Sequence, residues 1–175
     1  HDAIITSSKT IKKDNPLLTC RINGLETKSP KIIILDNFLS ISMKSNVVKN
    51  SYKNTTIIFY NKFNVKKIKL LKKRGVRVYK TALNKKGDLN LRNVLIKLKK
   101  LGLYRIFLES GMKLASNFLK ENLVNDLKIY ISKNKLNQNG SGNINEYLNS
   151  FLRKKKYNVE NVNLLGDKLI SYKIK

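Results

Sequence analysis

"LYRIFLESGMKLASNFLKENLVNDLKIYIS", residues 103–132, is the stretch that decides the fold, because it predicts a helix between two strands. The runs at its two ends, Arg105–Glu109 and Leu127–Ser132, are short and rich in β-branched and aromatic residues, as strands are. A helical pattern begins between them at Gly111. Its apolar stripe is predicted to be Leu114, Phe118 and Leu119. This order of elements is typical of a βαβ unit.

The same alternation extends toward the N-terminus. Four more apolar runs are predicted to be strands, most of them buried: Ala3–Thr6, Lys31–Asp36, Thr55–Tyr60 and Val76–Tyr79. Two amphipathic segments between these runs are predicted to be helices that stop at a glycine: Val65–Gly75 and Leu91–Gly102. The sequence therefore predicts an α/β fold with a mostly parallel central sheet flanked by helices.

The C-terminal segment "YNVENVNLLGDKLISYKIK" predicts an antiparallel hairpin, because two alternating runs flank Gly166 and Asp167. We expect this hairpin to add its strands to the central sheet. The polar stretch Asn134–Asn143 before it is expected to be a loop. No linker or internal repeat divides the chain, so one domain over residues 1–175 is expected.

The net charge of the chain is strongly positive, with 37 Lys and Arg against 11 Asp and Glu and a formal charge of +26. Such an excess is typical of proteins with nucleic-acid partners. Only six of the 37 are Arg, however, and Arg is the residue whose planar fork suits phosphates and base edges. No nucleic-acid-binding motif accompanies the charge. We expect a lysine-coated surface without a specific nucleic-acid partner, and a basic nucleic-acid-binding domain remains the alternative.

The cysteine and histidine content limits which disulfides, metal sites and cellular compartments are expected for the protein. Cys20 and His1 are single residues of their types, so neither an internal disulfide nor a common zinc ligand set can form. No signal peptide or long apolar span is visible. We therefore expect a cytoplasmic protein with no membrane partner and no metal site.

Two predicted strand ends carry polar residues, and ligands of open α/β sheets bind beyond such ends. Glu109 ends one strand, and Gly111 then begins a helix whose free N–H groups suit a phosphate. Asp36 and Asn37 end another strand. Each pair also has a purely structural interpretation, a helix cap at Glu109 and a turn at Asp36 and Asn37.

A third candidate site is "TSSKTIKKDNPLLTCR", Thr6–Arg21, where Thr10 lies one turn before Asp14. A carboxylate and the guanidinium of Arg21 on a rigid loop can bind a sugar hydroxyl and a phosphate. The residues expected to anchor this loop in the core are Leu17 and Leu18. The structural alternative is an ordinary Asp-Asn-Pro turn beside a surface arginine.

Taken together, these stretches resemble the reductase domain of riboflavin biosynthesis, the C-terminal half of the bifunctional pyrimidine deaminase-reductase. The resemblance is carried, in order along the chain, by "HDAIITSSKTIKKDNPLLTCR", "KIIILDN" and "LYRIFLESGMKLASNFLKENLVNDLKIYIS". It implies a dihydrofolate-reductase-like fold, a homodimer, and the NADPH-dependent reduction of the ribosyl group of 5-amino-6-(5-phosphoribosylamino)uracil to the ribityl product. The family also includes reductases of the non-deaminated 2,5-diamino-6-(ribosylamino)pyrimidinone phosphate, and both substrates are phosphorylated pyrimidines. A further alternative is a chain that keeps the fold without catalysis.

The resemblance implies roles for residues that match the family by position. The implied substrate contacts are Leu18, Arg21 and Glu109, with Arg21 as the partner of the phosphate. The implied contacts of the NADPH cofactor are Thr10, Asp14, Asn37, Gly111, Met112, Lys113, Leu114, Ala115, Ser116 and Asn117. Asp14 is the acid nearest the expected nicotinamide, which makes it the candidate proton donor.

The sequence departs from the family pattern in three respects. The family's reductase domain begins with an additional strand, and this sequence begins after it, so we expect a reductase domain that lacks that strand. The zinc-binding deaminase motifs are absent, so deamination is expected to come from another domain or protein of the pathway. The substituted positions are Asn37 for the usual Ser, Ser110 for Gly or Ala, Met112 for Pro and Asn125 for Asp.

Overall fold

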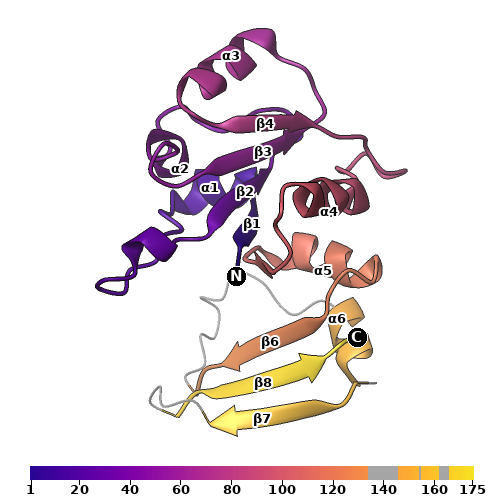
Figure 1. Cartoon of the computed structure of the whole chain (residues 1–175). Coiled ribbons are helices and arrows are strands. Elements are labelled where there is room, and N and C mark those ends of the chain that lie inside the picture. Colours follow the sequence, from indigo (N-terminus) through magenta and orange to yellow (C-terminus); the bar gives the residue numbers. More distant parts are fainter. Residues whose placement is uncertain (134–145, 154, 162–165) are drawn as a thin grey trace. The chain divides into compact units, whose positions relative to one another are not determined.

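The computed structural model describes residues 1–133, 146–153, 155–161 and 166–175. The chain divides into two compact units, His1–Gly111 and Met112–Lys175. Each unit has its own sheet (Figure 1). Each unit also has its own hydrophobic cluster.

The first unit is built on a parallel sheet of five strands. The strands are β1 (Ala3–Ser7), β2 (Lys31–Leu35), β3 (Thr56–Tyr60), β4 (Arg77–Lys80) and β5 (Ile106–Leu108). Their order across the sheet is β4-β3-β2-β1-β5, with every neighbouring pair parallel. All five predicted strands of this unit are therefore confirmed, and the strand order reverses between β1 and β5.

The helices of the first unit are α1 (Ser8–Asp14), α2 (Asn46–Lys49), α3 (Val65–Lys73) and α4 (Leu91–Lys100), with a 3-10 turn, η1, at Glu26–Lys28. The two long helices, α3 and α4, are confirmed. The α3 helix is followed by Gly75, whose φ is +77° and where a Cβ would lie 2.8 Å from the Tyr52 ring. The sequence analysis missed α1, α2 and η1.

Burial explains the long apolar runs of β2 and β3. Side chains of α1, α2 and α3 form one hydrophobic cluster with alternate residues of these strands: Ile11, Ile32, Ile34, Leu39, Ile41, Val47, Val48, Ile58, Tyr60, Ile68, Leu71 and Val76. The residues between them, such as Ile33, Ile57 and Phe59, point to the opposite face and are also buried. Both faces of these strands are therefore buried, as is usual for parallel sheets.

The second unit contains an antiparallel sheet of three strands with the order β6-β8-β7. Its elements are α5 (Met112–Lys120), β6 (Asp126–Ile131), α6 (Glu146–Arg153), β7 (Tyr157–Asn161) and β8 (Lys168–Lys173). The predicted C-terminal hairpin is confirmed as the β7–β8 pair. The prediction that it extends the central sheet is wrong, because in the described part of the chain β8 pairs with β6 instead. The predicted loop at residues 134–143 lies outside the described residues.

The predicted strand Leu127–Ser132 is confirmed as β6, but it lies in the antiparallel sheet and not in a parallel βαβ unit. Leu127 and Ile129 pack against the cluster of the second unit, which includes residues of α5 and α6. Lys128 and Tyr130, between and beyond them, are exposed. This alternation is typical of an antiparallel sheet with one solvated face. Lys128, in the middle of this run, was the sign in the sequence that one face of the strand is exposed.

Asp2 ties the start of β1 to the segment before β5. Its Oδ2 accepts hydrogen bonds from the backbone N–H groups of Arg105 (2.8 Å) and Tyr104 (2.7 Å). These two hydrogen bonds, that of Arg105 foremost, hold the pKa of the Asp2 carboxyl below its ordinary value of 3.8. The ionised carboxylate therefore stabilises the folded state.

We expect Asp2→Asn to lower the Tm at neutral pH and to have no effect in strong acid. Because the folded-state pKa is the lower one, the stabilisation is complete above about pH 4 and disappears as the pH falls through the folded-state pKa. Thermal unfolding followed by circular dichroism from neutral to acidic pH measures this. Asp14→Asn, the same change at an exposed carboxylate, is the control. An equal Tm difference at all pH values would contradict the prediction.

Candidate functional site

The carboxyl ends of β2, β1 and β5 lie next to one another at one edge of the parallel sheet. The register pairs Ser7 with Leu35 and Ile5 with Leu108. The segments that follow these strands therefore leave the same edge, and they contain the three predicted sites. The strand order also reverses here, between β1 and β5, which is where open α/β sheets bind ligands.

The first of these segments is α1, which begins directly after β1. It begins at Ser8 because the Ser7 side chain caps it and accepts a hydrogen bond from Thr10 N at 3.3 Å. The Thr10 hydroxyl lies 3.1 Å from that of Ser7. Asp14 is the last residue of α1 and is exposed. Thr10 and Asp14, four residues apart, lie on one face of the helix.

The loop after α1 carries the predicted substrate contacts. Leu18 has a φ of 54° and packs against the hydrophobic cluster of the first unit. Leu17 is 48% exposed, so the prediction that it anchors the loop is wrong. The left-handed backbone at Leu18 costs about 1 kcal/mol, and such strained residues are common at binding sites. Arg21 is exposed and has no carboxylate partner among the described residues.

Asp36 and Asn37, after β2, have different environments. Asp36 is 1% exposed, and its two oxygens accept hydrogen bonds from Ser40 Oγ and Ile41 N, both at 2.8 Å. The structural interpretation as a turn is therefore confirmed for Asp36.

Asn37 has an unused acceptor. Its Nδ2 donates to the Gly87 carbonyl at 3.4 Å, while its Oδ1 is buried and has no hydrogen-bond partner among the described residues. Buried polar atoms are nearly always hydrogen-bonded, so an unpaired one needs an explanation. A ligand that donates a hydrogen bond at this edge of the sheet would satisfy it.

Glu109 and Gly111 follow β5. Glu109 is exposed, and its N–H donates to the Ile5 carbonyl at 2.9 Å, which continues the pairing with β1. Gly111 is exposed, and the space where a Cβ would lie is open. The backbone at Gly111 is therefore accessible to a ligand.

The α5 helix begins at Met112, directly after Gly111, as predicted. Within the second unit, Met112 packs against the cluster of that unit, Ser116 is buried and Lys113 is exposed. Leu114, Ala115 and Asn117 are half-buried. A phosphate at this helix start would therefore meet mainly the backbone N–H groups of the first turn and the Lys113 side chain.

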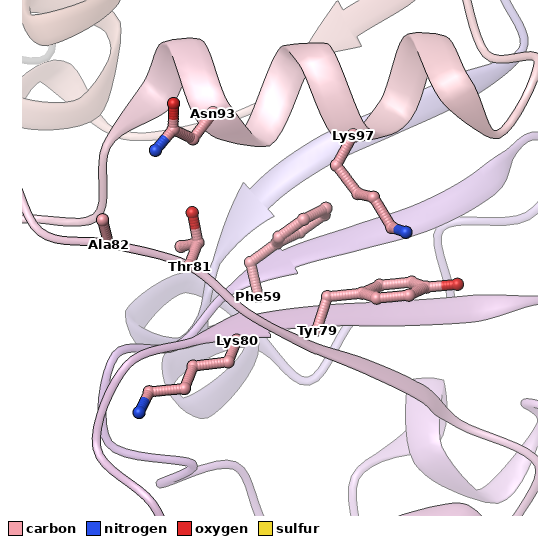
Figure 2. A pocket seen from close by; sticks show the side chains of 7 residues that line it. All are labelled: Phe59, Tyr79, Lys80, Thr81, Ala82, Asn93 and Lys97. Carbon is pink, nitrogen blue, oxygen red and sulfur yellow. The ribbon is translucent and has the colours of Figure 1, made fainter.

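A pocket of about 320 Å³ lies in the first unit, between α4 and the ends of β3 and β4 (Figure 2). Its lining residues are Phe59, Tyr79, Lys80, Thr81, Ala82, Asn93 and Lys97. Lys97 Nζ lies 4.5 Å from the centre of the Tyr79 ring, and Figure 2 shows Lys80 directed away from α4. None of the predicted site residues lines this pocket, and the sequence analysis did not find it.

Within the described residues, no group of three or more His, Cys, Asp or Glu side chains could hold a metal ion. No helix in the described part of the chain is long and apolar enough to span a membrane.

Comparisons with known proteins agree with the order of the motifs. The RibD C-terminal domain family matches residues 1–133. The riboflavin biosynthesis protein RibD of Aquifex aeolicus is 35% identical over 97% of this chain and 45% of its own length. That of Bacillus amyloliquefaciens is 27% identical over 75% of this chain and 34% of its own length. The chain thus spans about half or less of these curated relatives.

Solved structures share the fold. RibD of Acinetobacter baumannii (form 2) has a TM-score of 0.76 at 20% identity, over 98% of this chain and 46% of that one. The deaminase/reductase of Thermotoga maritima has a TM-score of 0.70 at 21% identity, over 99% of this chain and 45% of that one. The expected dihydrofolate-reductase-like α/β fold is therefore confirmed. With a family match over residues 1–133 of 175, the chain belongs to the RibD C-terminal domain family.

Proposed function

We propose that this chain is a reductase domain of riboflavin biosynthesis that uses NADPH to reduce the ribosyl group of 5-amino-6-(5-phosphoribosylamino)uracil to the ribityl product. One observation carries the proposal: in a chain of this family, three candidate ligand-binding segments leave the sheet side by side where the strand order reverses. The Thermotoga maritima structure, which has the same fold, is described as a deaminase and 5-amino-6-(5-phosphoribosylamino)uracil reductase.

The cofactor contacts are proposed from the chemistry of the groups at this edge of the sheet. Asn37 Oδ1, which lacks a partner among the described residues, would accept a hydrogen bond from a ribose hydroxyl or an amino group. Thr10 and Asp14 share one face of α1 and would contact the nicotinamide nucleotide. Gly111 and the first turns of α5, residues 112–117, would hold phosphate oxygens through backbone N–H groups. NADPH, when bound, supplies the hydride.

The substrate contacts are proposed on the same grounds. The Arg21 guanidinium has no carboxylate partner among the described residues and suits the substrate phosphate. Leu18 packs against the hydrophobic cluster of the first unit. The part of its side chain that is not buried would make an apolar contact with the pyrimidine. Glu109 would repel a phosphate, so it would accept hydrogen bonds from the base or a sugar hydroxyl. Asp14 is the proposed source of the proton that accompanies the hydride.

We also propose how the chain works in its setting. The two units would act as one reductase domain, because the likeness to the solved structures spans both of them. The domain would function as a cytoplasmic homodimer. The deamination that precedes this reduction would be carried out by another domain or protein.

The decay of NADPH absorbance tests the proposal. We expect oxidation when the chain is given the deaminated pyrimidine, and slower oxidation with its 2,5-diamino counterpart. Failure to oxidise NADPH with either pyrimidine would overturn the proposed activity.

A further inference from the structure

The loop that follows α1 begins with an unfavourable backbone conformation. Asn15, the residue after the last turn of α1, has φ 40° and ψ 49°, and Leu18 has a φ of 54°. Both lie in the left-handed region, which Asn tolerates better than most residues and which costs Leu about 1 kcal/mol. The contacts around this loop must therefore hold it in place.

Asn46 donates two hydrogen bonds to Asn15. The Asn46 backbone N–H donates to Asn15 Oδ1 at 2.9 Å, and Asn46 Nδ2 donates to the Asn15 carbonyl at 2.8 Å. The hydrogen bond from the Asn46 backbone orients the Asn15 side chain. The hydrogen bond from Asn46 Nδ2 holds the Asn15 carbonyl, after which the loop continues. Together they fix the direction in which the chain leaves α1.

Asn46 is itself held firmly because it is the first residue of α2. The next two residues, Val47 and Val48, are 1% and 0% exposed and belong to the hydrophobic cluster of the first unit. The preceding Ser45 is also buried. The two bonds to Asn15 therefore attach the loop to a part of the core that does not move easily.

The other end of the loop has its own attachment. Cys20 N donates to Ser29 Oγ at 3.0 Å, and between the two attachments Leu18 packs on the core. We define the substrate loop as Asp14–Arg21. Of the residues that the proposed function assigns to ligand contacts, Asp14 and Arg21 are the sequence neighbours of Asn15 and Cys20, and Leu18 lies between the two attachments.

We propose that Asn46 is a positioning residue of the reductase: its two hydrogen bonds to Asn15 hold the substrate loop in the conformation that binds substrate. The inference rests on the proposed function, because that function makes the loop a binding element. Asn46 itself contacts neither ligand in this proposal. Its effect reaches the substrate through the backbone of Asn15.

The single cysteine reports on the loop without any ligand. Cys20 is half-buried, so its rate of reaction with N-ethylmaleimide, followed by mass spectrometry, depends on how often the loop opens. We expect Asn46→Ala to label about threefold to tenfold faster than the parent, the factor that follows from losing one such hydrogen bond.

Asn64→Ala is the matched control. Asn64 is an Asn of the first unit that is exposed where Asn46 is half-buried, and it caps α3 by accepting a hydrogen bond from Lys67 N at 2.9 Å. Both variants are expected to lower the Tm by similar amounts, but only Asn46→Ala is expected to speed the labelling of Cys20. Equal labelling of the two variants would overturn the proposal, because Asn46 would then have only a general stabilising role.

The activity measurement completes the test. In a parent that oxidises NADPH, kcat/KM for the pyrimidine substrate is expected to fall about threefold to tenfold in Asn46→Ala and to stay unchanged in Asn64→Ala. Faster labelling with an unchanged kcat/KM would overturn the positioning role. If the unmodified chain is inactive, only the proposed function is contradicted. The labelling of Cys20 still measures whether Asn46 holds the loop.

Discussion

Arg21→Ala is expected to lower kcat/KM for the pyrimidine substrate by about tenfold to a hundredfold while the Tm stays the same. A hydrogen bond between a guanidinium and a phosphate is charge-assisted and contributes about 1.5–3 kcal/mol, and 1.4 kcal/mol corresponds to a factor of ten. The fold loses little because Arg21 is exposed and has no carboxylate partner among the described residues. Steady-state kinetics and thermal unfolding measure the two effects.

Two variants sharpen this experiment. Arg21→Lys keeps the charge but loses the planar fork, so an intermediate kcat/KM is expected. Arg77→Ala removes another exposed arginine of the same unit, on β4, and controls for the loss of general positive charge. The assignment of Arg21 to the phosphate is contradicted if Arg21→Ala and Arg77→Ala have the same kcat/KM.

Asp36→Ala is expected to lower the free energy of unfolding by about 3 kcal/mol, because it removes a buried charged acceptor of two hydrogen bonds. Asp36 is 1% exposed, and its loss leaves the N–H of Ile41 without its partner in a residue that is 0% exposed. Urea unfolding measures the difference between the variant and the parent. The activity of Asp36→Ala is expected to fall with its stability, because the turn that carries Asn37 loses its support.

The neighbouring residue gives the matched comparison. Asn37→Ala is expected to weaken NADPH binding and to lower the free energy of unfolding by no more than about 1 kcal/mol. It removes one long hydrogen bond, from Nδ2 to the Gly87 carbonyl at 3.4 Å, and an acceptor that has no partner among the described residues. Titration of NADPH against both variants distinguishes the two roles. If Asn37→Ala is as destabilised as Asp36→Ala and binds NADPH normally, both residues merely shape the turn.

The sequence predicted the first unit well because its strands β2 and β3 are buried on both faces. Continuous apolar runs such as Ile32–Leu35 leave few alternatives to a parallel strand. The α3 and α4 helices are long enough to show a helical period. The seven residues of α1 and the four of α2 are too few for that, so only the capping hydrogen bond from Thr10 N to Ser7 marks the start of α1.

Side-chain contacts in the folded structure distinguish the roles of site residues that the sequence alone could not distinguish. Spacing alone treats Asp36 and Asn37 alike, and their roles differ only because Ser40 and Ile41 bond to Asp36. The pair of bonds between Asn15 and Asn46 joins residues 31 positions apart, so no local pattern could predict it. The pocket in Figure 2 likewise combines side chains of β3, β4 and α4.

The central position of β1 has a consequence for how the protein folds. β1 can pair with β2 early, but its other edge has to wait for β5, and the hydrogen bond between Asp2 and Tyr104 closes a loop of 102 residues. Closing so long a loop loses chain entropy before any contact compensates, which slows folding. On the ribosome, one side of the first strand stays unpaired until Ile106–Leu108 has been synthesised, and during that time the nascent chain is open to misassembly.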